Sequence, residues 1–226
     1  MKPLFVDENV ELHRERLATT CRDLYRQGWM PGTSGNLSVR SGEAVVITAS
    51  GRGKRTMSRN DTVLVDPFEG LPLTGETEWP SAETSIHLAV YRYVPDCGAV
   101  IHAHTPYATA VATLWGAGPA WGEVCFEELE LAKGLGVVDP ARVVVPVFAN
   151  WADVPRIAAD VRSYLGGSGV PAPPALLIDR HGVTVWGHDL DQARDRLECV
   201  EDLSRLTLLT TEREPRTARK TAEAGP

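Results

Sequence analysis

The chain has 226 residues, 43% of them hydrophobic, and a formal net charge of −7, which fits one globular domain with an ordinary core. The charges form no basic stripe, which argues against nucleic-acid binding as the main role. The four cysteines lie far apart without a CxxC pair, so neither a zinc ribbon nor a disulfide framework is expected. No apolar run approaches the roughly 18 residues of a membrane span, and we expect a soluble, cytoplasmic protein.

The first part of the chain predicts a helix, a group of antiparallel strands and a second helix. Apolar residues recur at about helical spacing over residues 8–27, and Gly28 follows as a natural stop. Short β-rich segments separated by Gly, Ser and Asn predict a meander with tight turns, at residues 33–40, 44–50 and 62–67. A Pro-Ser start with an acid in the first turn then predicts a helix over residues 80–94.

The second part mixes strands and helices. We expect strands at 98–104 and 142–148, helices at 106–114, 126–136 and 154–165, a hairpin at 174–187 with its turn at Arg180–Gly182, and a long helix at 189–209 capped by Asp189. The order is not a regular βαβ alternation, so we predict one α/β domain with a mixed sheet over residues 1–210. The polar segment 211–226 has few large apolar side chains and is expected to be disordered.

Three histidines are candidates for a metal site. His102 and His104, in "GAVIHAHTPYA", are two residues apart on a predicted strand and therefore project to the same face. His181 lies in the turn "DRHGV", where the adjacent glycine lets the backbone come near another group. Three imidazoles with one open coordination position are typical of catalytic zinc. The alternative is that His102 and His104 are hydrogen-bonded histidines at a strand end, because an HxH pattern alone is a weak signal.

Two acidic residues have a possible catalytic role. Glu83 lies in the first turn of its predicted helix, where a favourable interaction with the helix dipole also explains it. It precedes His87 by four residues and shares its helix face, so a supporting carboxylate–imidazole pair is expected near the metal strand. Glu130 is one of four acids between Glu123 and Glu130, and a solvated helix face explains such a group equally well.

Two polar loops are candidates for an anion site. "TSGNLS" (33–38) and "TASGRGK" (48–54) are rich in Ser, Gly and Asn, with Arg52 or Lys54 available as a cation. Backbone N–H groups in such turns form anion-binding concavities, which hydroxyl groups and a cation can complete. Ordinary hairpin turns explain either loop equally well, and the Walker pattern GxxxxGK[ST] is absent.

Taken together, several stretches resemble the zinc-dependent class II aldolase family, which includes fuculose- and rhamnulose-phosphate aldolases, ribulose-phosphate epimerases and methylthioribulose-1-phosphate dehydratases. They occur in the family's order from Gly28 to Leu209: "GWMPGTSGNLSVR", "ITASGRGK", "PSAETSIHLAVYR", "GAVIHAHTPYATAV" and "LLIDRHGVTVWG". The resemblance implies a three-layer α/β/α domain with a central, mainly antiparallel sheet. It also implies a homotetramer with the active site near a subunit interface.

The resemblance also implies roles for particular residues. It makes His102, His104 and His181 the ligands of one Zn²⁺ per subunit. It places Asn36, Ser50, Gly51 and Ser81 around a substrate phosphate, with Lys54 as a looser candidate. It makes Glu130 the catalytic acid/base, and Glu83 matches an acidic position that the aldolases use near the metal.

Within the family, "ELAKGLG", "VPVFAN" and "HGVTVWGHDLDQARDRLECVEDL" resemble the dehydratase branch. This implies the conversion of 5-methylthioribulose 1-phosphate to 2,3-diketo-5-methylthiopentyl 1-phosphate and water, in methionine salvage. The partner expected is a small sugar phosphate, without nucleic acid or membrane. A sugar-phosphate aldolase is the first alternative, although the absence of tyrosine after Tyr164 disfavours it because several aldolases use one there. A non-catalytic zinc-binding structural or interaction protein is the second.

Overall fold

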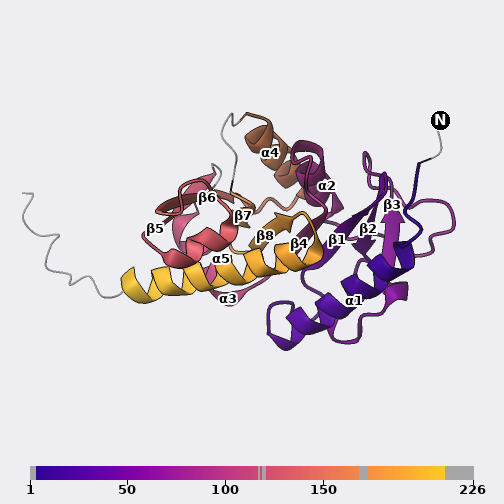
Figure 1. Ribbon diagram of the computed structural model, residues 1–226, viewed down its shortest axis with the longest axis horizontal. Coiled ribbons are helices and arrows are strands. Elements are labelled where there is room, and N and C mark those ends of the chain that lie inside the picture. The colour runs from indigo at the N-terminus through magenta and orange to yellow at the C-terminus, as the bar shows by residue number, and fades with distance from the viewer. Residues whose placement is uncertain (1–3, 117, 119–120, 168–172, 212–226) are drawn as a thin grey trace, which may run out of the picture.

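The computed structural model describes residues 4–116, 118, 121–167 and 173–211. In this part of the chain eight strands form one sheet in the order β3-β2-β1-β4-β8-β7-β6-β5 (Figure 1). The strands are β1 (Asn36–Ser41), β2 (Ala44–Thr48), β3 (Thr62–Val65), β4 (Ala99–Ala103), β5 (Gly122–Glu127), β6 (Arg142–Phe148), β7 (Ala175–Ile178) and β8 (Gly182–Gly187). β6 and β7 pair in parallel, and the other neighbouring strands are antiparallel.

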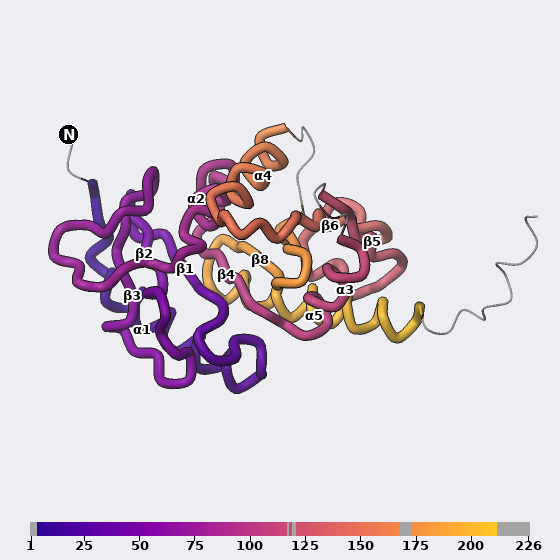
Figure 2. The backbone as a smooth tube through the Cα atoms, turned by 180° about the vertical axis from the view of Figure 1, so that it is seen from behind, coloured from indigo at the N-terminus to yellow at the C-terminus, as the bar shows by residue number. Residues whose placement is uncertain are grey.

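Helices cover both faces of the sheet. The α-helices are α1 (Val10–Arg26), α2 (Thr84–Tyr93), α3 (Pro106–Trp115), α4 (Val154–Gly167) and α5 (Leu190–Thr211), and the 3₁₀ turns are η1 (Lys54–Thr56), η2 (Arg59–Asp61) and η3 (Glu130–Leu135). One apolar cluster joins the sheet to α1, α3 and α5, and a second joins the opposite face to α2 and α4. Figures 1 and 2 show α2 and α4 side by side on one side of the sheet and α5 along the other. The expected three-layer α/β/α fold with a mainly antiparallel sheet is confirmed.

The N-terminal predictions hold, with small shifts at the ends. α1 ends just before Gly28, whose φ of +81° is a left-handed conformation that glycine adopts without strain. β1, β2 and β3 form the predicted antiparallel meander. Along β2 the side chains alternate between the two cores: Val46 packs in the cluster with α1, while Val45 and Ile47 pack in the cluster with α2. This alternation fixes which face each strand residue presents.

The helix predicted over residues 80–94 begins later, at Thr84. Before it, the chain runs beside the end of β2, where the Ser50 N–H donates to the Trp79 carbonyl at 2.9 Å and the Ser81 N–H donates to the Thr48 carbonyl at 3.2 Å. These backbone bonds hold residues 79–81 extended and delay the helix. As a result Ser50 and Ser81 come from adjacent strand-like segments.

The helix predicted over residues 126–136 is wrong. Residues up to Glu127 belong to β5, and a 3₁₀ turn, η3, follows from Glu130. Val124 and Phe126 alternate into the core with a period of two, and the Glu128 φ of 53° breaks the regular backbone between the two elements. Gly136 ends the turn in the left-handed region, as its predicted stop position requires.

The C-terminal hairpin and helix match the prediction. β7 and β8 join through a tight turn at residues 179–181, and Asp189 caps α5 by accepting a hydrogen bond from the Gln192 N–H at 2.8 Å. The predicted disordered tail, apart from Thr211, lies outside the described residues. Within them, no helix is long and apolar enough to cross a membrane, and the four cysteines are free.

Candidate metal centre and anion cradle

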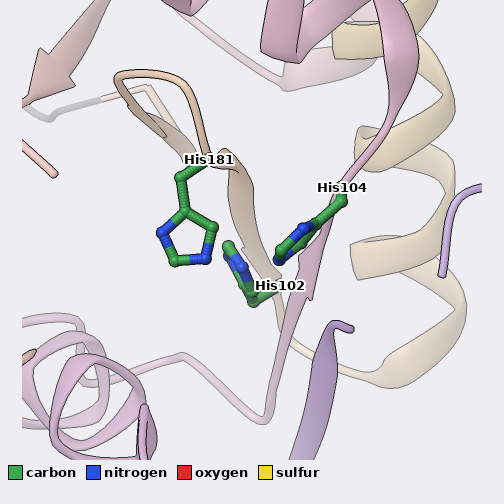
Figure 3. A group of neighbouring side chains, drawn as sticks. All are labelled: His102, His104 and His181. Carbon is green, nitrogen blue, oxygen red and sulfur yellow. The ribbon is translucent and has the colours of Figure 1, made fainter. Parts of the chain in front are cut away.

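Three histidines from two parts of the sheet meet at one end of it (Figure 3). His102 lies near the end of β4, His104 directly follows that strand, and His181 lies in the β7–β8 turn. The ring centroids are 5.0, 4.8 and 4.7 Å apart, and the ring planes are close to mutually perpendicular. The nearest ligand nitrogens all lie within 4.8 Å of one another. The sequence prediction that these three side chains converge is therefore confirmed.

The donor set fits a divalent metal. His102 is 1% exposed, and its Nε2 has no hydrogen-bond partner in the described part of the protein. Its Nδ1 lies 3.0 Å from Oγ1 of the buried Thr184, its direct partner across β4 and β8. An imidazole held through one nitrogen while the other stays free is the arrangement of a metal-ligating histidine with a supporting hydrogen bond. Three imidazoles at one point suit zinc and several other divalent ions.

The protonation states of His102 and His104 also favour metal binding. Burial lowers the pKa of His104 to about 3 and moves the pKa of His102 in the same direction. Both rings are thus neutral at pH 7, which leaves a lone pair on each for coordination.

Glu83 is the carboxylate next to the three rings. Its Oε1 lies 3.0 Å from His181 Nε2, its Oε2 lies 3.4 Å from His102 Nε2, and the Asn36 amide donates to Oε2 at 2.6 Å. Burial raises its pKa, but His102 and the hydrogen bonds from His181 and Asn36 outweigh this effect, so the pKa lies below the usual range. An ionised carboxylate therefore lies beside the three histidines. It occupies the N-cap position of α2 without capping it, so the predicted helix-dipole role is not its main contact.

A cavity of about 220 Å³ lies against this group. It is lined by two of the histidines, Glu83, the two polar loops and the segment before α2, and all five residues predicted around the phosphate are among its walls: Asn36, Ser50, Gly51, Lys54 and Ser81. The structure thus brings together the two loops that sequence reasoning considered separately, because β1, β2 and residues 79–81 are neighbours at one sheet end. That these residues bind phosphate stays a prediction.

Lys54 is a buried lysine whose ammonium group already has two hydrogen-bond partners in the protein. It is 1% exposed, and its Nζ donates to the carbonyls of Thr33 at 3.0 Å and Arg52 at 2.9 Å. Burial lowers its pKa. Lys54 therefore ties the two loops together from behind, and one N–H of its ammonium group is left for the cavity.

Glu130 is not part of this cavity. It is 84% exposed and forms an ion pair with Lys133 at 2.7 Å. The histidines lie at the end of the sheet where Val147 pairs with both Gly122 and Leu177, whereas Glu127 pairs with Arg142 five residues further along. At roughly 3.4 Å per residue, the Glu127 end of β5, which leads to Glu130, lies about 17 Å along the strand from the Gly122 end, where the histidines are. Its catalytic role stays a prediction, and one chain does not bring it to its own histidines.

Sequence reasoning missed two supporting residues. Thr184 holds His102 across the sheet, and only the strand register identifies it. Glu201 of α5 is 6% exposed and accepts the N–H groups of Tyr107 at 3.0 Å and Ala108 at 2.8 Å, at the start of the helix that follows His104. An acid in a helical sequence gave no signal of this contact.

The structure is thus an α/β/α fold with a three-histidine group that could hold a metal ion, beside a polar cavity, which is the arrangement of a candidate active site. The sequence model of the Class II Aldolase and Adducin N-terminal domain matches residues 15–208, and the chain belongs to this family.

Comparisons with individual known proteins agree with this family assignment. The chain is 40% identical over 202 residues to the methylthioribulose-1-phosphate dehydratase of Microcystis aeruginosa, covering 85% of this chain and 93% of the relative. It is 50% identical over 195 residues to a protein of Nocardia farcinica named as a probable bifunctional methylthioribose-1-phosphate isomerase/methylthioribulose-1-phosphate dehydratase, covering 86% of this chain but 35% of that protein.

Solved structures support the fold. YgbL from Klebsiella pneumoniae is 27% identical with a TM-score of 0.76, and the match covers 92% of this chain and 93% of YgbL. An L-fuculose 1-phosphate aldolase is 25% identical with a TM-score of 0.73, covering 92% of this chain and 90% of that one.

Proposed function

We propose that this chain is a lyase of the class II aldolase family that removes water from 5-methylthioribulose 1-phosphate. The observation that carries the proposal is that the histidine group and the polar loops with Asn36, Ser50, Gly51 and Ser81 line one cavity. A ketose phosphate requires a group for its carbonyl oxygen and another for its phosphate. Relatives at 38 and 40% identity, each covered over 93% of its length, are named methylthioribulose-1-phosphate dehydratase. Such similarity supports the same activity here.

The reaction removes a proton from C3 and hydroxide from C4, which leaves an enol across C3 and C4. The enol takes a proton at C4 and becomes the 2,3-diketone, so one water is lost in total. The chemistry thus needs a base at C3 and an acid at the departing C4 hydroxyl group. General acid–base help of this kind contributes roughly 10²–10⁴ in rate.

We assign His102, His104 and His181 as the ligands of one metal ion per subunit, and we propose that this ion is zinc. Such an ion supplies a Lewis acid that stabilises negative charge on the ketose oxygens. Asn36, Ser50, Gly51 and Ser81 bind the phosphate in this proposal, and Lys54 adds positive charge from behind the loops.

Glu83 is the carboxylate of the cavity, and we assign it a proton transfer next to the metal group. Glu130 keeps the acid/base role that the resemblance implies. Because it lies exposed near the other end of the sheet, we propose that it acts on the site of a neighbouring copy in a homotetramer. Two carboxylates then serve as the base at C3 and the acid at the departing C4 hydroxyl group. We place the enzyme in the cytoplasm and in methionine salvage.

The test is a turnover assay with 5-methylthioribulose 1-phosphate on protein whose metal content has been measured. We expect the diketone phosphate to form at a rate that follows metal content, and His102→Ala to lose both metal and turnover. Release of dihydroxyacetone phosphate from fuculose or rhamnulose 1-phosphate, without dehydration, would identify an aldolase instead. Stoichiometric metal with no turnover of any of these sugar phosphates would indicate a non-catalytic member.

A further inference from the structure

A buried line of hydrogen bonds runs from α2 and β1 to the carboxylate at the metal group. Tyr91 Oη lies 2.9 Å from Ser38 Oγ, and Ser38 Oγ lies 2.7 Å from His87 Nδ1. His87 Nε2 lies 2.6 Å from Asn36 Oδ1, and Asn36 Nδ2 donates to Glu83 Oε2 at 2.6 Å. Ser38 and His87 are fully buried, and Asn36 and Tyr91 are 4 and 5% exposed.

The chemistry of these groups fixes the direction of every donor. The ionised Glu83 carboxylate only accepts, so Asn36 presents its NH₂ to Glu83 and its carbonyl to His87. A carbonyl also only accepts, so the His87 proton is on Nε2. His87 Nδ1 then accepts from the Ser38 hydroxyl group, and Ser38 Oγ accepts from Tyr91. One consistent set of donors satisfies the whole line.

The spacing shows why these two elements build such a line. Glu83, the N-cap residue of α2, is followed at intervals of four by His87 and Tyr91, which places the three on one side of the helix. Asn36 and Ser38 are two residues apart and share one face of β1. Asn36 is also the direct cross-strand partner of His102. Burial lowers the pKa of His87 to about 3, so the ring is neutral at pH 7 and able to accept at one nitrogen while donating at the other.

We propose that His87 is a positioning residue that orients Glu83 for proton transfer by holding the Asn36 amide in one orientation. With the His87 N–H in place, the Asn36 NH₂ faces Glu83 and fixes Oε2, which leaves Oε1 turned toward His181. Without it, the Asn36 amide loses one of the two side-chain hydrogen bonds that fix it, so its NH₂ holds Glu83 Oε2 less firmly. This inference rests on the role proposed above for Glu83.

A measurement on the metal-free full-length protein tests the donor order directly. Nitrogen-15 NMR of histidine-labelled protein at pH 7, with the His87 signal assigned by its loss in His87→Gln, should show a proton on Nε2 and none on Nδ1. A proton on Nδ1, or on both nitrogens, would overturn the proposal. This result does not depend on which substrate the enzyme uses.

Kinetics test the consequence. His87→Leu removes both polar atoms, and we expect kcat to fall by about 10- to 100-fold, the size of effect that a misplaced catalytic group gives. Metal content should stay within about twofold of the wild type because the three histidines are unchanged, and KM should change less than kcat because only Asn36 among the residues proposed to bind the phosphate loses a contact. His87→Gln, whose amide can donate to Asn36 and accept from Ser38, should restore most of the lost kcat.

The control is Val90→Ala, which weakens the same helix in the apolar core and leaves the hydrogen-bond line intact. It should lose stability and keep its kcat. An unchanged kcat in His87→Leu, an equal loss of kcat in Val90→Ala, or no restoration by His87→Gln would each show that His87 is merely structural. Absence of turnover in the wild type would count against the proposed function instead, and the NMR result would still decide the donor order.

Discussion

Gly182 lies tightly against the end of β4, the strand that carries His102 and leads directly into His104. A Cβ atom at this position would lie 2.4 Å from the Ala103 carbonyl oxygen and 3.3 Å from His102 Cε1. The backbone atom cannot yield without moving β4 from β8. The predicted close approach next to His181 is thus confirmed, and its reason is contact between two strands.

We expect Gly182→Ala to cost about 1–3 kcal/mol of unfolding free energy, as overpacking of a tight interior does. Metal affinity should fall as well, because the substitution presses on His102. Chemical denaturation and metal titration measure the two effects. Gly167→Ala, where a new Cβ meets nothing within 4 Å, is the control and should lower neither stability nor metal affinity. A fully stable Gly182→Ala protein with normal metal affinity would contradict the argument.

The buried neutral His87 predicts a pH dependence of stability. Its pKa is about 3 in the folded protein and 6.5 in the unfolded chain, so below pH 6.5 the unfolded state takes up a proton that the folded state does not. The contribution of neutral His87 to the unfolding free energy is therefore fully present above pH 6.5 and is lost as the pH falls toward 3. At pH 5 the loss from His87 is about 2 kcal/mol.

Urea denaturation at pH 7 and pH 5, in the presence of a chelator, measures this difference. The drop in unfolding free energy between the two pH values should be smaller in His87→Gln than in the wild type. Val90→Ala should shift both values equally and keep the wild-type drop. Equal drops in His87→Gln and the wild type would show that His87 is not the group responsible.

Among the secondary-structure elements, α3 shows how one helix positions another. Its N-cap residue, Thr105, makes no side-chain cap and its buried hydroxyl group has no partner in the described residues, while Pro106 supplies the expected helix start. Glu201 provides the cap from α5 instead. Since α3 follows His104 directly, this contact anchors the chain just beyond a candidate ligand.

Glu201→Ala should destabilise the protein by about 1–2 kcal/mol, since it leaves two N–H groups of the first helical turn without their acceptor. Denaturant midpoints are the measurement. Glu198→Ala, on the same helix and paired with Arg194 near the surface, is the matched control and should cost less than about 0.5 kcal/mol. Equal losses in the two variants would refute the cap.

At the level of the assembly, the position of Glu130 leads to a test with mixed copies. A His102→Ala chain keeps Glu130, and a Glu130→Gln chain keeps the histidines. Each variant alone should lose at least about 100-fold in turnover. Coexpressed in one oligomer, they should recover about a quarter of wild-type activity, because one neighbouring pair in four combines an intact histidine group with an intact Glu130.

Two outcomes would contradict this arrangement. No recovery in the mixed oligomer would mean that Glu130 acts within its own chain or through the fold. Near-normal turnover of Glu130→Gln alone would remove Glu130 from the mechanism and leave Glu83 as the carboxylate that moves protons.

Local sequence pattern determined α1, the meander, the terminal hairpin and the convergence of His102 and His104, because hydrophobic period, turn residues and strand alternation depend on neighbours in the chain. It did not determine β5, where pairing with β6 overrides a sequence that reads as helical. Nor could it place the N-terminus of α2, which backbone bonds to β2 delay to Thr84.

The site divides in the same way. The three candidate ligands and the two polar loops were recognisable from residue types, spacing and resemblance. The contacts of Glu83, the clamp formed by Lys54, the supports from Thr184 and Glu201 and the remote position of Glu130 depend on which strands become neighbours and in what register. Those choices are set by packing between residues far apart in sequence, so only the tertiary structure decided them.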